Sequence, residues 1–346
     1  MQFEGRMARP LRIEYPGAAY HVVARGNQGH AIFKDDPDRK RFLETLAEAC
    51  AKTGWRIHAY VLMGNHYHLL VETPEGNLVA GMKWLQGAYT QRYNGRHRVF
   101  GHLFQGRYKA VVVDNGDANY LQVVSTYIHL NPARSGLIRI GQEPLKRYRW
   151  SSYPWYLSRQ CPDWLRRDVV MGSLGLRPGD RRGYEAYLEG RVLELGRRAD
   201  REACERCWKA IRRGWYLGEA PFLAKLKGRL AKALAGRRRE SQQGAARARH
   251  DAAAAERLLG EGMKALGLTE VELARMAKGA PEKVALAWWL RARTTVTLRW
   301  VGDRLGLGHY TRVTQAVSRM NRKPGRKQAA LGKKLSALNA KGKSPR

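Results

Sequence analysis

Short stretches in which apolar residues cluster or alternate with polar ones mark the first third of the chain. They are rich in Val, Ile, Leu and Tyr and are bounded by Gly-Asn pairs or other polar turns, a pattern typical of β-strands. The Gly64-Asn65 pair separates two of them and predicts a β-hairpin. We therefore expect four strands, at residues 18–25, 55–63, 66–73 and 107–114.

Between these stretches the apolar residues recur at helical spacing. Phe42, Leu46 and Cys50 predict a helix after the first strand, and a stripe beginning at Leu78 predicts another after the third strand. The resulting order is β-α-β-β-α-β, the split βαβ or ferredoxin-like arrangement. A further helix is expected from Asp117 to about Asn131, because the proline that follows disfavours helical backbone at the preceding residue.

The pattern changes near residue 160, where strand-like stretches give way to Arg- and Ala-rich ones. The fold class expected is α+β, a ferredoxin-like domain followed by a mostly α-helical C-terminal region. The predicted segments are the α+β domain at residues 8–160, a basic helical linker at 161–250, a helical domain at 251–320 and a disordered basic tail at 321–346.

The charge of the chain narrows the class of partner. Lys and Arg number 64 against 30 Asp and Glu, a formal net charge of +34, which indicates a polyanionic partner such as nucleic acid. An anionic membrane is the rival, but no apolar run reaches membrane-spanning length and the N-terminus lacks the apolar core of a signal peptide. We expect a cytoplasmic, nucleoid-associated protein that binds DNA or RNA and no membrane.

The four cysteines fit a reducing compartment. Cys50 lies on the apolar face of a predicted helix and is expected to be buried. Cys204 and Cys207 form a lone C-x-x-C in a charged helical stretch, where no second pair or nearby histidine supports a zinc site. Cys161 has no evident role.

Two histidines, His66 and His68, lie two residues apart in the third predicted strand. Side chains alternate across a strand, so these two imidazoles project from the same face while Tyr67 points to the other. Two neighbouring imidazoles can hold one divalent metal ion, although a bare His-x-His is equally consistent with two surface histidines.

The helix expected before Pro132 carries Tyr127 and Asn131 at i and i+4, on one face near its end. Alone, this pair would indicate a half-buried aromatic ring and a helix-capping amide. A helix after the fourth strand of a ferredoxin-like sheet can lie near the strand that carries His66 and His68. Two imidazoles and an amide oxygen could then form an incomplete cage for Mg²⁺ or Mn²⁺, with Tyr127 as a nucleophile toward a DNA phosphodiester.

Five segments together resemble a known family. They are "YHVVARGNQ" (20–28), the "HYH" strand, "HLFQGRYKAV" (102–111), "YIHLNPARSGL" (127–137) and "YRWSSYPWY" (148–156). Residues 8–157 resemble the single-tyrosine HUH transposases, and more narrowly the REP-associated tyrosine transposases. The resemblance implies that His66 and His68 hold the metal and that Tyr127 attacks to leave a 5′-phosphotyrosine and a free 3′-OH. It implies Asn131 as a third ligand, a position where some relatives place glutamine.

Basic, amide and aromatic residues in the loops of this domain are candidate contacts to DNA backbone or extruded bases. At a net charge of +34 many basic side chains must simply be solvated, so each of them is also explained without DNA. The candidates are Arg25, Asn27, Arg107, Tyr108 and Lys109.

Residues 297–320 are interpreted as a helix-turn-helix with a glycine-containing turn at 306–308. Arg312, Gln315 and Arg319 would face outward from its second helix, and Arg and Gln are residue types that contact guanine and adenine edges. The segment resembles the DNA-binding domain of bacterial replication initiators. The alternative is two packed helices in a basic bundle.

Together these observations predict a metal-dependent transposase or endonuclease that cuts and rejoins single-stranded DNA at hairpin-forming repeats, and that also binds duplex DNA. One tyrosine per chain requires either two active sites, as in a homodimer, or two sequential events. One rival is a domesticated, non-catalytic repeat-binding regulator, which would need none of the four proposed site residues. The other is an RNA-binding protein, which would need exposed aromatic residues on its central strands.

Overall fold

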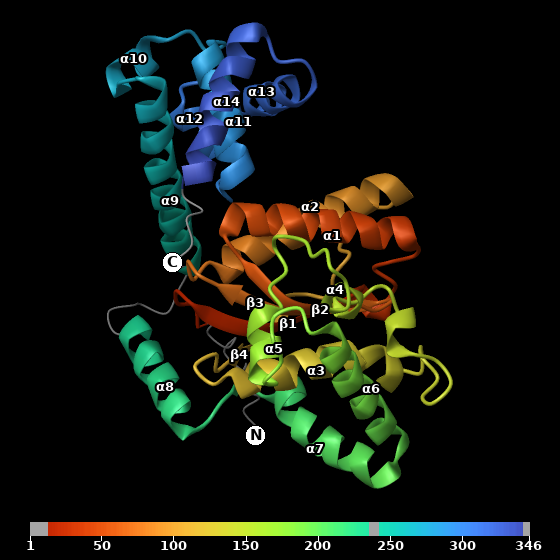
Figure 1. Ribbon diagram of the computed structural model, residues 1–346. Coiled ribbons are helices and arrows are strands. Elements are labelled where there is room, and N and C mark those ends of the chain that lie inside the picture. The colour runs from red at the N-terminus through yellow and green to blue at the C-terminus, as the bar shows by residue number, and fades with distance from the viewer. Residues whose placement is uncertain (1–12, 235–241, 342–346) are drawn as a thin grey trace, which may run out of the picture. The chain divides into compact units, whose positions relative to one another are not determined.

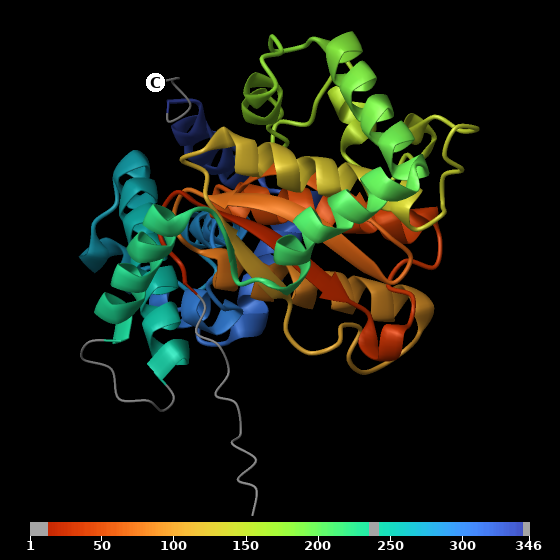
Figure 2. The same cartoon turned by 90° about the horizontal axis from the view of Figure 1, so that it is seen from below.

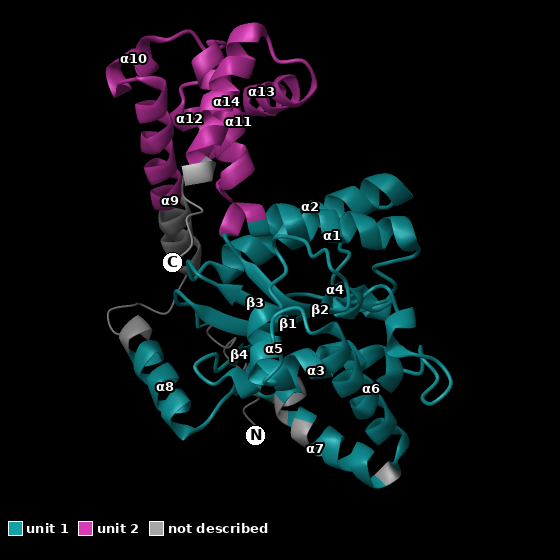
Figure 3. Cartoon of the chain, in the orientation of Figure 1, with its two compact units in different colours: residues 1–50, 54–236 teal, residues 51–53, 237–346 magenta. Residues whose placement is uncertain are grey.

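The computed structural model describes residues 13–234 and 242–341. The chain divides into two compact units, the first made of residues 1–50 and 54–236 and the second of residues 51–53 and 237–346 (Figure 3). Each unit has its own apolar core and is described by itself.

The first unit is built on a five-stranded sheet with the order β2-β3-β1-β4-β5 (Figure 1). The first four strands pair antiparallel, and β1 and β3 lie at the centre of the sheet. This is the order that a split βαβ unit produces, so the predicted α+β class is confirmed. The strands are β1 (Ala18–Arg25), β2 (Arg56–Leu62), β3 (His66–Thr73), β4 (Lys109–Val113) and the short β5 (Tyr216–Leu217), which pairs parallel with β4.

Helices cover both faces of this sheet (Figure 2). One face packs on α1 (Asp36–Thr53) and α2 (Leu78–His97) and receives Tyr67 from β3. The opposite face packs on α3 (Ala118–Arg134), and Leu70 of β3 joins that core. The two faces therefore follow the side-chain alternation expected of β3.

Helix α3 runs three residues further than the sequence predicted. Pro132 lies inside its last turn, and the helix ends at Arg134. Two short 3-10 turns complete this part of the unit, η1 (Asn27–Gly29) after β1 and η2 (Leu145–Arg147).

The segment predicted as a basic linker, residues 161–250, is divided between the two units, and its described residues 161–234 are part of the first. Buried side chains of its helices, such as Met171, Tyr184 and Trp208, join the core on the α3 side of the sheet. Many charged residues lie between its apolar residues, so the apolar pattern did not reveal which positions face the core. Helix α4 (Tyr153–Tyr156) precedes this segment, whose helices in the first unit are α5 (Asp168–Ser173), α6 (Arg181–Gly196), α7 (Arg198–Arg213) and α8 (Ala220–Leu234).

The described part of the second unit is helical. A core that includes Trp289, Val301 and Val313 lies among its helices. The disorder predicted after residue 320 is wrong for residues 326–341, because they form a helix whose Leu335 is buried in this core. The helices are α9 (Gln242–Leu266), α10 (Glu270–Arg275), α11 (Pro281–Arg293), α12 (Leu298–Arg304), α13 (Tyr310–Arg322) and α14 (Arg326–Lys341).

None of the helices within residues 13–234 and 242–341 combines the length and the apolarity needed to cross a bilayer.

Candidate functional site

Three histidines, not two, meet on the α3 face of the sheet. His66 and His68 project together from β3, and His21 joins them from β1. The rings of His21 and His68 are stacked, with centroids 5.1 Å apart, and share a hydrogen bond of 2.9 Å between Nε2 of His21 and Nδ1 of His68. His21 was missed because only the pairing of β1 with β3 brings it to this place. Its position within "YHVVAR", in phase with Arg25, was the available signal.

Burial keeps these imidazoles neutral. It lowers the pKa of His21 to about 3 and that of His66 to about 4, and it lowers the pKa of His68 well below its usual value. The positive charges of Arg25 and Arg134 add to the effect on His66 and His68 respectively. At neutral pH each ring therefore carries one lone pair, the form in which histidine binds a metal ion.

The hydrogen bonds of His66 and His68 fit the role of metal ligands. Nδ1 of His66 lies 2.8 Å from Oδ1 of Asn65, which can only accept, so His66 donates there and its Nε2 keeps the lone pair. Nδ1 of His68 bonds to His21, and when it donates, its Nε2 is likewise free to ligate. Within the described residues, however, no three His, Cys, Asp or Glu side chains form a group that could hold a metal.

Tyr127 of α3 lies against these histidines. Its ring meets those of His21 and His68 edge-on, with centroid distances of 5.6 and 5.7 Å. Residues from β1, β3 and α3 that are up to 106 positions apart in the chain (21 to 127) thus form one cluster. The structure brings Tyr127 and His68 together as the sequence analysis expected.

The ring of Tyr127 is covered, with only 3% of the residue exposed. Trp208 of α7 packs edge-on against it at 5.5 Å between centroids. The guanidinium carbon of Arg134 lies 4.8 Å from the centroids of both rings, and Glu205 of α7 holds Arg134 through an ion pair of 2.6 Å. Helix α7 is therefore a cover over the tyrosine, which sequence reasoning missed entirely.

The same helix accounts for part of the C-x-x-C motif. Cys204 is buried in the core beside α3, and Nη2 of Arg191 lies 3.6 Å from its sulfur. Cys204 is thus packed as a core residue.

Asn131 is buried next to the cluster, but its amide is engaged. Its Nδ2 donates to the carbonyl oxygen of Tyr127 at 2.9 Å, and its Oδ1 accepts from Nη1 of Arg134 at 3.2 Å. The oxygen that would bind a metal is thus held by a guanidinium. That oxygen has a second lone pair, so Asn131 can still serve as a third ligand while it accepts from Arg134.

Two of the predicted DNA-contact residues lie on the same face as the histidines. Arg25 pairs with His66 across β1 and β3, and Lys109 of β4 pairs with Val23, which in turn pairs with His68. Residues directly paired across strands point to one face, so both cations border the cluster.

The remaining loop candidates differ in their surroundings. Arg107 is exposed, and the backbone N–H of Asn27 donates to Leu103. Tyr108 is a correction: its ring is buried in the core on the α1 and α2 side of the sheet, where it is not available to stack on a base.

In the second unit, α12 and α13 are joined by a short turn that contains Gly306 and Gly308, both with positive φ. Along α13, Val313, Ala316 and Met320 are buried, whereas the side of the helix with the proposed contacts is solvent-accessible. The exposed residues there include Arg312, Gln315 and Arg319.

Comparison with known proteins bears on the first unit. Residues 14–131 match the model of a family described as "Transposase IS200 like". Of the solved structures, one titled "Structure of the REP associates tyrosine transposase bound to a REP hairpin" is similar over 47% of this chain and 93% of its own, with 15% identity and a TM-score of 0.37. No curated protein matches the chain. The match to residues 14–131 spans all three histidines, Tyr127 and Asn131.

Proposed function

We propose that this protein, whose residues 14–131 match the IS200-like transposases, cuts single-stranded DNA at hairpin-forming repeats and rejoins it through Tyr127. The observation that carries the proposal is the contact of the Tyr127 ring with His68 on a sheet face bordered by Arg25 and Lys109. A phenol, neutral imidazoles and fixed cations are the groups that phosphodiester transfer requires.

In this reaction Oη of Tyr127 attacks the phosphorus of the scissile phosphodiester and the bond to the 3′ oxygen breaks. The phenolic proton passes to water, and the departing 3′ oxygen takes up a proton to become a free 3′-OH. The products are a 5′-phosphotyrosine and a free strand end. Because the phosphotyrosine keeps the energy of the ester bond, attack by another 3′-OH reverses the step and rejoins DNA.

His66 and His68 would hold a divalent ion, Mg²⁺ or Mn²⁺, through their Nε2 atoms. When bound, such an ion polarises the phosphate and stabilises the charge that develops on it. Arg25 and Lys109 would bind neighbouring phosphates and orient the strand. Asn131 would complete the ligand set through the second lone pair of its Oδ1, the first being hydrogen-bonded to Arg134.

The cover formed by α7 makes opening part of the cycle. A phosphate oxygen resembles the carboxylate oxygen of Glu205 in charge, so a DNA phosphate can replace Glu205 on Arg134. That exchange would remove one contact that holds α7 over Tyr127, and it would place Arg134 on the substrate.

A second candidate function is favoured by the same cover. The 3% exposure of Tyr127 is what a repeat-binding regulator without catalysis would also show. The two functions differ in one product, because only the enzyme forms a covalent bond to DNA.

The deciding experiment uses single-stranded hairpin DNA labelled at its 3′ end, since the tyrosine would remain joined to the downstream fragment. In Mn²⁺, the wild-type protein should give a denaturant-resistant labelled adduct and Tyr127→Phe should give none. Tyr120→Phe, two turns earlier on α3, is the matched control and should react like wild type. An adduct formed by Tyr127→Phe would refute the assignment, and no adduct from wild type would favour the regulator.

A further inference from the structure

An open pocket of about 680 Å³ lies in the first unit, between the segment that follows β1 and the loop that follows α2. From its lining we propose that it binds an unstacked nucleobase of a single-stranded nucleic acid beside the His66–His68 site. The inference rests on the proposed function and adds a base-binding subsite to it. The lining of the pocket includes Asn27, Gln28, Lys34, Asn94, Phe100 and His102.

The chemistry of the lining suits a base and its phosphate. Amide side chains and backbone groups can pair with the edge of a base, and the ammonium group of Lys34 can contact a phosphate. Among the described residues that line the pocket, none is acidic. Phe100 is 99% exposed, so its ring offers a free π-face on which a base can stack.

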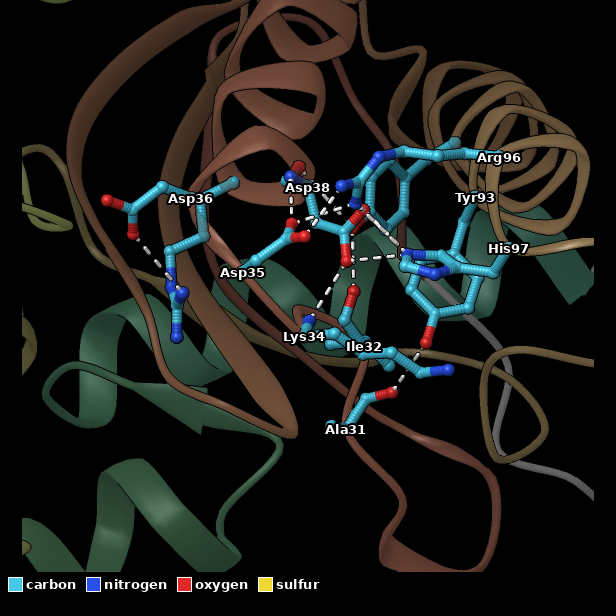
Figure 4. Close-up of polar contacts among 11 residues, drawn as sticks. Ala31, Ile32, Lys34, Asp35, Asp36, Asp38, Tyr93, Arg96 and His97 are labelled. Carbon is cyan, nitrogen blue, oxygen red and sulfur yellow. Dashed lines mark hydrogen bonds and ion pairs between the residues drawn. The ribbon is translucent and has the colours of Figure 1, made fainter.

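Ion pairs hold one wall of the pocket in place (Figure 4). Asp38 of α1 accepts from the backbone N–H of Lys34 at 2.9 Å and binds Arg96 and His97 of α2 at 2.5 and 2.9 Å. Oη of Tyr93 donates to the carbonyl oxygen of Ala31 at 3.3 Å. The segment is therefore fixed before any ligand arrives, which reduces the entropic cost of binding.

Strained backbone marks the same place. In the described part of the chain, the non-glycine residues with a left-handed backbone are Gln28 (φ 53°) and Arg98 (φ 54°). Gln28 lines the pocket, and Arg98 directly precedes the Val99-Phe100 segment that forms its other side. Such conformations are uncommon outside glycine and concentrate at binding and catalytic sites.

The pocket is connected to the proposed metal ligands by short contacts. Nδ2 of Asn65 donates to the carbonyl oxygen of Gly29 at 3.0 Å, while Oδ1 of the same amide bonds to Nδ1 of His66 at 2.8 Å. The carbonyl oxygen of Gly64 accepts from the backbone of Ile32 and Phe33 at 3.0 and 3.1 Å. A base in the pocket would therefore set the register of the strand relative to the cleavage site.

A protein segment is the other occupant that an exposed phenylalanine could attract. The pocket offers it one aromatic ring among amides and imidazoles, whereas protein docking sites have an apolar centre. The high positive charge of the chain also favours a polyanion. These points favour the nucleobase.

The test compares two single-stranded probes that carry the same phosphates, oligothymidylate of 12 nucleotides and an abasic oligomer of equal length. We expect Phe100→Ala to weaken binding of oligothymidylate about tenfold, the size of one lost stacking contact, and to leave binding of the abasic oligomer unchanged. Phe100→Trp should retain wild-type affinity for both. Leu137→Ala, at another exposed apolar residue of the same unit, is the control and should change neither.

Equal affinity of Phe100→Ala and wild type for oligothymidylate would overturn the proposal, and so would an equal loss for both probes. Phe100 is fully exposed, so its replacement does not disturb the core. The readout is binding and needs no cleavage. If the wild-type protein forms no adduct but Phe100→Ala still weakens binding of oligothymidylate alone, the base-binding pocket stands and the proposed cleavage chemistry fails. The failure of one proposal can therefore be told from the failure of the other.

Discussion

The α3 face of the sheet and the outer side of α13 are both basic, but they differ in how their functional groups meet solvent. In the first unit Tyr127 and His68 are buried among rings and covered by α7. In the second unit, Arg312 and Arg319 lie on a single helix and are exposed to solvent. The first arrangement is suited to chemistry and the second to reading a surface.

Burial explains why the side chains of the two regions can do different chemistry. On the sheet it keeps the three imidazoles neutral, so that His66 and His68 can ligate a metal. On α13 exposure keeps the guanidinium groups hydrated and free to bind phosphates or base edges in a groove. We therefore propose that catalysis and duplex binding are divided between the units, and the predictions below test that division.

The largest expected effect is the loss of cleavage when a histidine ligand is removed. His66→Ala or His68→Ala should each lower the yield of the covalent adduct at least about 100-fold, because two ligands on one strand act as a unit. Binding of duplex DNA should be unchanged, since it is assigned to the other unit. Adduct gels and duplex titrations on the same preparations measure both, with excess chelator on wild type as a parallel. Full cleavage by the wild-type protein in excess chelator would show that His66 and His68 do not act as metal ligands in the reaction.

The second effect is a loss of folding stability in acid, which is expected in the first unit alone. Burial lowers the pKa of His129 to about 3, so the unfolded chain takes up its proton first. The stability contribution is complete above about pH 6.5 and is lost as pH falls toward 3. At pH 5 the stability lost through this residue amounts to about 2 kcal/mol, or about 30-fold in the unfolding equilibrium.

Hydrogen exchange of the full chain at pH 7 and pH 5 measures this difference. The amides of the sheet and α3 should lose protection at pH 5, and those of α11 and α13 should not, because His309 at the start of α13 is exposed. His129→Gln should reduce the loss in the first unit. Equal losses in both units would show that the buried histidines do not set the acid response.

The third effect is expected in duplex binding. Replacing Arg312 and Arg319 together with Ala should weaken duplex affinity about tenfold and reduce its salt dependence by the equivalent of about two phosphate contacts. Hairpin cleavage should continue at the wild-type rate. Arg257 and Arg275, which are exposed on the same unit outside residues 297–320, provide the control pair. Unchanged duplex binding in the Arg312 and Arg319 variant would remove the support for a helix-turn-helix.

The elements of the sheet were predictable because their signals are local. The alternation in residues 18–25 and 66–73 predicted β1 and β3 with the observed bounds, and Gly64-Asn65 marked the hairpin. The spacing of His66 and His68 placed them on one face for the same reason. Tyr127 was found through helical spacing and through the resemblance of the segments around it.

The features that were not predicted from the sequence depend on contacts between distant parts of the chain. His21 needs the register of β1 against β3, and α7 needs the packing of Trp208 on Tyr127, some 80 positions apart (127 to 208). Tyr108 looked available because a single strand does not reveal which of its faces is covered. In residues 326–341 a run of basic residues masked the apolar positions that pack on the helical core.

The smallest expected effect is a gain of activity, and it tests whether the cover over Tyr127 limits the reaction. Glu205→Gln removes one charge of the ion pair that fixes α7 to Arg134 while keeping the shape of the side chain. Such a partly exposed pair contributes about 1 kcal/mol, so adduct formation should become about fivefold faster. The matched control is Glu185→Gln, which breaks the exposed ion pair with Lys146 and should leave the rate unchanged. A rate for Glu205→Gln at or below that of wild type would mean that α7 positions Arg134 for the reaction instead of holding it back, and the burial of Tyr127 would then belong to the reactive state.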